Sequence, residues 1–160
     1  MADSFIRPAN ASDADLILAL LHELAVYEKL TDKFKITPDV IARDYFGENP
    51  LVWCDLIFEG DMPAGIAAWY WTYATFAAKR ALYLEDLFVR LRFRGRGYGK
   101  ALLEHLARKA VRANAVGMEW SVLPWNKPSI EFYELLGAER MTDWHIYQLS
   151  GDALAKLGGA

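Results

Sequence analysis

Apolar residues recur at intervals of three and four in several parts of this chain, which is the repeat of a helix that buries one face. The clearest run covers residues 16–24 and follows Ser12 and Asp15, a pair with the spacing of a capping box. We expect this first helix to end near Glu28. Three more helices are predicted over 37–46, 98–114 and 126–136.

Alternating apolar and polar positions, with many aromatic and β-branched side chains, predict strands. Gly60 and Asp61 form a turn signal, so 51–59 and 64–73 are expected to pair as a hairpin. The other strands are expected at 4–8, 81–89, 118–123 and 144–149. The predicted order is β-α-α-β-β-β-α-β-α-β, a mixed α/β (α+β) fold with helices over a sheet whose first half is largely antiparallel.

Length and composition predict one globular domain over 1–160. The chain has 160 residues, 54% of them hydrophobic, and no repeat or Pro/Ser-rich linker divides it. The longest uncharged run, 62–78, contains Pro63, Gly65, threonines and aromatics, a composition suited to a sheet rather than to a membrane span. We expect a cytoplasmic protein, because no signal-peptide pattern begins the chain and Cys54 has no second cysteine to pair with.

Charge is unevenly distributed. Residues 1–61 carry 5 basic and 12 acidic side chains, whereas 79–112 carry 10 basic and 3 acidic ones. The basic part contains RGRGYGK, residues 94–100, between an expected strand and an expected helix. Glycines leave successive backbone amides uncovered, and a helix N-terminus adds partial positive charge. The stretch therefore suits an anion such as a pyrophosphate.

Two nucleotide-binding motifs do not fit these residues. A P-loop would need glycine in place of Arg94 and Ser or Thr in place of Ala101, and a dinucleotide fingerprint begun at Gly95 would need glycine in place of Lys100. Taken alone, the stretch also fits a tight turn with solvated charge. Nucleic acid is not expected as a partner, because the chain is acidic overall and its basic residues lie in one short segment.

The stretch resembles the R/Q-x-x-G-x-G/A loop with which the GNAT N-acetyltransferase superfamily binds acetyl-CoA. Five more blocks, in the same order, resemble its diamine (spermidine/spermine) and thialysine N-acetyltransferase branch: FIRPA at 5–9, ELAVYEKL at 23–30, FGENP at 46–50, YLEDLFV at 83–89 and WN-x-PSI-x-FY-xxx-GA at 125–138. This resemblance implies a GNAT fold and a homodimer. Its mixed, strongly twisted central sheet is flanked by about four helices, and its fourth and fifth strands part to admit the pantetheine arm of the cofactor.

The same resemblance implies which residues hold acetyl-CoA. A strand segment would bind the pantetheine through its backbone, the glycine stretch would hold the pyrophosphate, and the next helix would contact the cofactor. No metal is expected. The implied cofactor-binding residues are Leu87, Phe88, Val89, Arg94, Gly95, Arg96, Gly97, Tyr98, Gly99, Lys100, Asn126, Ser129 and Tyr133.

Acetyl transfer to an amine needs an unprotonated nitrogen, yet free alkylamines, with a pKa of about 10, are mostly protonated at neutral pH. Glu85 and Asp86 interrupt otherwise apolar strand faces. Burying a carboxylate there is costly, so each of these acids is expected to have a binding partner or a functional role. Strict alternation puts Tyr83, Glu85, Leu87 and Val89 on one face and Asp86 on the other. The residues alone also allow an acid that caps a backbone group at a strand bend. The resemblance implies that Glu85 binds the acceptor and acts as a base through water.

Tyr133 matches the general acid of the family, which protonates the departing coenzyme A thiolate. Without the resemblance, an aromatic residue beside Phe132 on an amphipathic helix would be assigned to the core. Tyr27 and Glu28, near the end of the first helix, fall where the family binds the amine. Alone they would be a helix-end aromatic and a solvated acid. The implied catalytic residues are Tyr133 and Glu85, and the implied substrate-binding residues are Tyr27, Glu28, Glu85 and Asp86.

The expected function is acetyl-CoA-dependent N-acetyltransfer to a primary amine of a small molecule, by direct attack in a ternary complex. The acceptor is a diamine or polyamine, or a thialysine- or lysine-like amino acid. Ala74 and Phe76 stand where the polyamine enzymes carry an acid and a tryptophan, whereas EKL at 28–30 looks like the thialysine branch. The alternatives are a GNAT enzyme that acetylates a protein amine or another metabolite, and a non-catalytic nucleic-acid or ligand-binding module. No membrane association is expected.

Overall fold

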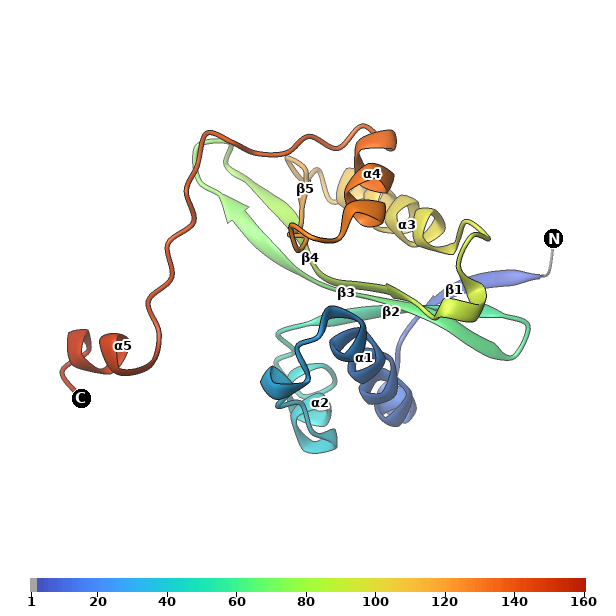
Figure 1. Cartoon of the computed structure of the whole chain (residues 1–160), viewed down its shortest axis with the longest axis horizontal. Helices are drawn as coiled ribbons and strands as arrows, with labels where there is room; N and C mark the ends of the chain where they lie inside the picture. Colours follow the sequence, from blue (N-terminus) through green and yellow to red (C-terminus); the bar gives the residue numbers. More distant parts are fainter. Residues whose placement is uncertain (1–2) are drawn as a thin grey trace. The chain divides into compact units, whose positions relative to one another are not determined.

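The elements follow the predicted order through the fifth strand in a computed structural model that describes residues 3–160 (Figure 1). Contacts divide the chain into two compact units, Met1–Ser121 and Val122–Ala160. The first unit holds β1 (Ser4–Pro8), α1 (Ala14–Glu28), α2 (Pro38–Asp44), β2 (Trp53–Glu59), β3 (Met62–Ala74), β4 (Lys79–Val89), α3 (Tyr98–Arg112) and β5 (Met118–Glu119). The second holds α4 (Lys127–Leu135) and α5 (Gly151–Leu157).

The five strands form one mixed sheet in the order β1-β2-β3-β4-β5. The first four are antiparallel, and β5 runs parallel to β4. Within the described residues β5 pairs with β4 only at Leu82 and Tyr83. The remainder of β4, from Leu84 to Val89, therefore has one edge outside this ladder. The expected parting of the fourth and fifth strands stays a prediction, which this short ladder supports.

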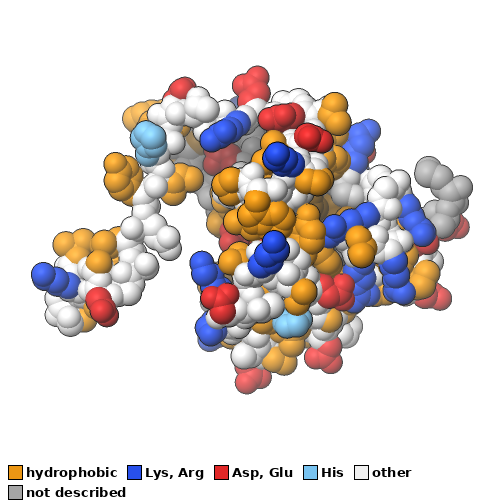
Figure 2. Space-filling view, in the orientation of Figure 1, with side chains coloured by type: hydrophobic (Ala, Val, Ile, Leu, Met, Phe, Trp, Pro, Cys, Tyr) orange, Lys and Arg blue, Asp and Glu red, His pale blue; other side chains and the backbone are white. Residues whose placement is uncertain are grey.

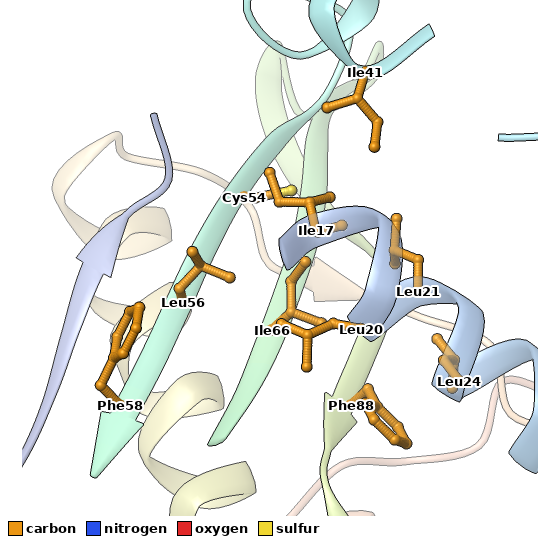
Figure 3. Packing of buried hydrophobic residues seen from close by; sticks show 11 residues of the cluster. Ile17, Leu20, Leu21, Leu24, Ile41, Cys54, Leu56, Phe58, Ile66 and Phe88 are labelled. Atoms are coloured by element: carbon orange, nitrogen blue, oxygen red, sulfur yellow. The ribbon is translucent and has the colours of Figure 1, made fainter. Parts of the chain in front are cut away.

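Helices cover both faces of the sheet. The apolar side of α1 packs with α2, β2 and β3 in a cluster of buried side chains, which Figure 3 shows. Its members include Ile17, Leu20, Leu21, Leu24, Ile41, Leu56 and Ile66. The other face lies against α3, which buries Leu102 and Leu106 completely. The two leucine-rich helices predicted from the sequence, α1 and α3, therefore pack on opposite faces of one sheet.

The start of α1 differs in detail from the prediction. Asn10 and Asp13 form the capping box: the Asn10 side chain accepts from the Ser12 amide, and the Asp13 carboxylate accepts from the Asn10 amide at 2.8 Å. Arg7 holds the same carboxylate at 2.7 Å and 2.8 Å. The expected Ser12–Asp15 box is wrong because a short 3-10 turn over Ala11–Asp13 precedes the helix.

A buried acid connects α3 to the sheet. Asp55 on β2 is 1% exposed, and its side chain accepts a hydrogen bond from Trp69 Nε1 at 2.8 Å. Its other oxygen lies 3.1 Å from His105 Nε2 and 3.6 Å from Lys109 Nζ. His105, on α3, thus takes part in a network with the sheet. A buried carboxylate needs such partners, because an unpaired one carries a large desolvation cost.

The last predicted strand is wrong. Residues 144–149 form no helix or strand, and Trp144, Ile146 and Tyr147 are exposed. The strand expected over 118–123 is reduced to Met118–Glu119. Alternation describes an amphipathic extended chain, but a strand forms only where another strand pairs with its backbone. The short helix α5 follows instead and was not expected. Between residues 3 and 160, no helix is both long and apolar enough to cross a membrane.

Candidate functional site

A β-bulge in β4 determines how its two acids are placed. The register with β3 passes from the pair Ala68–Asp86 directly to Trp69–Leu84. Glu85 is therefore the extra residue and has no partner across this ladder. A bulge of this kind re-aims side chains and is common beside functional sites.

The bulge also overturns the expected arrangement of faces. Tyr83 pairs with Tyr70 and Asp86 pairs with Ala68, so Tyr83 and Asp86 share one face of the sheet. Leu87 lies on the opposite face. The prediction that Tyr83 and Leu87 share a face is wrong, because one inserted residue reverses the alternation on its far side.

Three of the four residues that were expected to bind the amine substrate form an acidic cluster. They are Glu28 at the end of α1, and Glu85 and Asp86 on β4. Burial, followed by the charges of Glu85 and Glu28, raises the pKa of Asp86 to about 7. Burial also raises the pKa of Glu28. Charges of the same sign that act on Asp86 in this way create a negative potential that attracts a cation.

Tyr70 and Tyr45 also belong to this region, and neither was expected from the sequence. The Tyr70 hydroxyl donates to Glu85 Oε2 at 3.1 Å. Burial and the Glu85 charge raise the pKa of Tyr70 to about 12, so the hydroxyl keeps its proton at neutral pH. Tyr45 follows α2, and burial, together with the charges of Cys54, Asp86 and Glu85, raises its pKa as well. Only the strand register and the packing of α2 place these phenols near the acids.

The Asp86→Asn variant is expected to be more stable than the wild type at pH 8 and to lose this advantage toward pH 5. The Asp86 carboxyl titrates near 4 when unfolded and at about 7 when folded, so the native state binds more protons between these values. The wild-type free energy of unfolding therefore falls as the pH rises through this window, whereas asparagine does not titrate. We expect a difference of roughly 1–3 kcal/mol at pH 8, measured by urea denaturation.

The exposed acid Glu48, replaced by glutamine, serves as the control for this measurement. Its stability should follow the wild-type pH dependence. An Asp86→Asn stability change that is the same at pH 5 and pH 8 would contradict the assigned cause.

The loop between β4 and α3 has the backbone form that its glycines suggested. Gly95 and Gly97 have φ of 74° and 83°, and Gly97 is the N-cap of the 15-residue helix α3. A Cβ built on either glycine meets nothing within 4 Å, so the space beside these backbone groups is open. Lys and Arg side chains gather where the chain passes from β4 to α3 (Figure 2). Open amides at a helix N-terminus can bind an anion.

Several side chains of this loop have partners within the protein. Arg96 Nη1 pairs with both carboxylate oxygens of Glu59, at 2.7 Å and 2.8 Å, and the Tyr98 hydroxyl donates to the same carboxylate. Lys100 pairs with Glu104 at 3.1 Å. The loop is thereby anchored to the end of β2, and the Arg96 guanidinium is committed to Glu59.

Arg94 connects the loop to Tyr27, one of the residues expected to bind the amine substrate. Its Nε donates to the Val89 carbonyl at 2.9 Å, and its guanidinium lies 4.4 Å from the centroid of the Tyr27 ring. Phe88, one of the expected cofactor-binding residues on β4, is 6% exposed and belongs to the core. Phe88 can therefore contribute to a cofactor site through its backbone only.

The second unit presents the remaining candidates on α4. The Asn126 side chain caps this helix by accepting from the Ser129 amide at 3.4 Å. Tyr133 is half-buried, with its ring 5.5 Å from that of Phe132. Gly137, with φ of 87°, follows the helix as expected.

Comparison with known proteins identifies the class. The model of the Acetyltransferase (GNAT) family matches residues 18–138, and the chain belongs to this family. It is an acetyltransferase with a mixed α/β fold.

The chain is similar over nearly its whole length to several known proteins. It is 35% identical to thialysine N-epsilon-acetyltransferase of Sus scrofa, with 99% of each chain covered. It is 29% identical to an L-ornithine N5-acetyltransferase of Arabidopsis thaliana, with 96% of this chain and 87% of that one covered. A similarity of 35% to spermidine/spermine N(1)-acetyltransferase-like protein 1 of Homo sapiens covers 95% of this chain and 23% of that protein.

Among solved structures, an integron cassette protein from the mobile metagenome of V. cholerae has a TM-score of 0.84 and 25% identity, with 100% of this chain and 99% of that one covered. An aminoglycoside acetyltransferase from a soil metagenome has a TM-score of 0.76 at 13% identity, over 92% of this chain and 97% of that one, a likeness of fold alone.

Proposed function

We propose that this enzyme transfers the acetyl group of acetyl-CoA to a primary amine of a small molecule. The observation that carries the proposal is the acidic cluster on β4 and α1, because three carboxyl groups suit an acceptor that arrives as an ammonium ion. Relatives named for thialysine, ornithine and spermidine/spermine support the same acceptor class. The acceptors we propose are a diamine or polyamine and a thialysine- or lysine-like amino acid.

The residues present fit acetyl-CoA in two places. Gly95 and Gly97 leave their amides open for the pyrophosphate, and the edge of β4 that carries Leu87 and Val89 lies outside the β4–β5 ladder. Asn126 and Ser129 would contact the cofactor from α4. We assign Arg96 to anchoring the loop rather than to phosphate binding, since Glu59 neutralises its charge.

The proposed reaction proceeds in a ternary complex. Bound acetyl-CoA supplies a thioester for the acceptor nitrogen to attack. Glu85 takes the proton of the ammonium ion, directly or through a water, while Glu28 and Asp86 hold the cation. Tyr133 donates its phenolic proton to the departing sulfur.

Replacing Gly97 with alanine is expected to weaken acetyl-CoA binding about tenfold. The left-handed φ of 83° strains any side chain, and the new Cβ projects into the open space beside the amides. Titration calorimetry measures the effect. Gly60→Ala is a matched control, because Gly60 also has a positive φ with nothing within 4 Å but lies in the β2–β3 turn. Equal affinity in Gly97→Ala and wild type would remove the loop from the cofactor site.

Thiol release coupled to a chromogenic reagent tests the whole proposal. Purified protein with acetyl-CoA should turn over at least one of putrescine, spermidine, thialysine, lysine and ornithine. Bound acetyl-CoA without turnover of any of these amines would refute the small-amine acceptor. Turnover restricted to a peptide amine would favour the alternative of a protein acetyltransferase.

We also propose that residues 1–160 form a single GNAT domain that assembles as a homodimer. The family model crosses the boundary between the two compact units, which supports one domain. Light scattering on the purified protein tests the dimer. A monomer mass at micromolar concentration would contradict it.

A further inference from the structure

Because of the bulge, Glu85 has no partner on β3, so strand pairing alone does not fix the position of its side chain. The side chain is exposed, and a glutamate has several accessible rotamers that cost free energy to restrict. A catalytic base must nevertheless stay within hydrogen-bond reach of the proton it removes. Some contact outside the backbone ladder has to hold this carboxylate.

Tyr70 makes such a contact. Its hydroxyl donates to Glu85 Oε2 at 3.1 Å from the neighbouring strand β3. The ring is fixed in turn, because it stacks on Tyr83 with centroids 5.2 Å apart and planes 25° apart. The Tyr83 hydroxyl lies 3.1 Å from Ser121 Oγ, beyond β5. A row of two stacked phenols therefore runs across β3 and β4 and ends on the Glu85 carboxylate.

We infer that Tyr70 is a positioning residue for the acetyl transfer: its hydroxyl holds the Glu85 carboxylate in the orientation from which it accepts the proton of the amine. The inference rests on the proposed function, since Tyr70 acts through Glu85. A carboxylate has two oxygens with several acceptor sites. A bond from Tyr70 to one oxygen leaves the other able to receive the proton.

The other groups around Glu85 are not suited to this task. Its neighbours are acids, which repel a carboxylate when they are charged, and two phenols, of which Tyr83 lies against Ser121 Oγ. They are Glu28 from α1, Tyr45 after α2, and Tyr83 and Asp86 from β4. The neutral hydroxyl of Tyr70 supplies a donor without adding a positive charge that would compete with the incoming ammonium ion.

The test compares Tyr70→Phe with Tyr83→Phe at saturating acetyl-CoA, with the best amine found by thiol release. Tyr70→Phe keeps the stacked ring and loses only the donor to Glu85. We expect kcat to fall about tenfold, while the KM for acetyl-CoA stays within about twofold. Tyr83→Phe also keeps the stack and loses only its contact with Ser121, so its kcat should stay within about twofold of the wild type. An unchanged kcat in Tyr70→Phe would overturn the inference.

A double variant separates positioning from general damage. In a Glu85→Gln background, Tyr70→Phe should cause almost no further loss, because both changes remove one shared function. A further tenfold loss in that background would show that Tyr70 acts independently of Glu85 and would overturn the inference.

Crystal structures of the wild type and both phenylalanine variants provide a measurement that does not depend on turnover. The Glu85 side chain should occupy one conformer in the wild type and in Tyr83→Phe, and several in Tyr70→Phe. One unchanged Glu85 conformer in all three would overturn the inference. Failure of the wild type to acetylate any amine would instead contradict the proposed function.

Discussion

Replacing Glu85 with glutamine is expected to lower kcat by about 10²–10³-fold at neutral pH, with little change in the KM for acetyl-CoA. Glutamine keeps the shape of the side chain and a carbonyl oxygen that accepts from Tyr70, but it cannot take a proton. General bases contribute a rate factor of this size. Steady-state thiol release at pH 7.5 with varied amine and varied acetyl-CoA measures the two effects separately.

The pH dependence provides a stricter criterion for this variant. Alkylamines lose their own proton near pH 10, so the deficit of Glu85→Gln should shrink as the pH approaches that value. Glu48→Gln removes an exposed acid elsewhere in the first unit and should leave kcat unchanged. A deficit that stays constant up to pH 10 would mean that Glu85 holds the acceptor without acting as a base.

Replacing Tyr133 with phenylalanine is expected to lower kcat by about 10²-fold with small changes in either KM. The departing thiolate, whose conjugate acid has a pKa of about 8.5, leaves more readily when a proton reaches the sulfur as the carbon–sulfur bond breaks. Phenylalanine retains the ring contact with Phe132 and the packing of α4. Single-turnover measurements at saturating substrates report on the chemical step directly.

The second unit offers a matched control for Tyr133. Tyr147 is 93% exposed, and Tyr147→Phe removes one hydroxyl from the same unit without touching α4. Its kcat should equal that of the wild type. Equal rates for Tyr133→Phe and wild type would exclude Tyr133 as the general acid.

The local pattern of the chain was sufficient for most of the fold. The period of leucines predicted α1 and α3, and the turn at Gly60–Asp61 predicted the β2–β3 hairpin, because these elements depend on contacts made within short segments. Residues 144–149 show the limit of this reasoning. Their alternation resembles that of a strand, but pairing depends on a distant segment that the pattern does not contain.

The sequence predicted several residues of the candidate site, but it did not predict the contacts between them. The acids at 85 and 86 and the glycines at 95 and 97 were found from the sequence, whereas the β-bulge that separates the two acids in register was not. A bulge is a property of two strands together. For the same reason, the bond from Tyr70 to Glu85 and the pairing of Arg96 with Glu59 had no local signal.

The short contact between β4 and β5 has a consequence for the protein before it binds its cofactor. A sheet edge with free backbone groups is a site where other chains can add a strand and start aggregation. Here that edge runs only from Leu84 to Val89 and is interrupted by the bulge, which disfavours regular pairing. A ligand that hydrogen-bonds to this edge takes the place that a foreign strand would occupy. In the proposed cofactor site, acetyl-CoA would occupy this edge and would thereby disfavour the addition of a foreign strand.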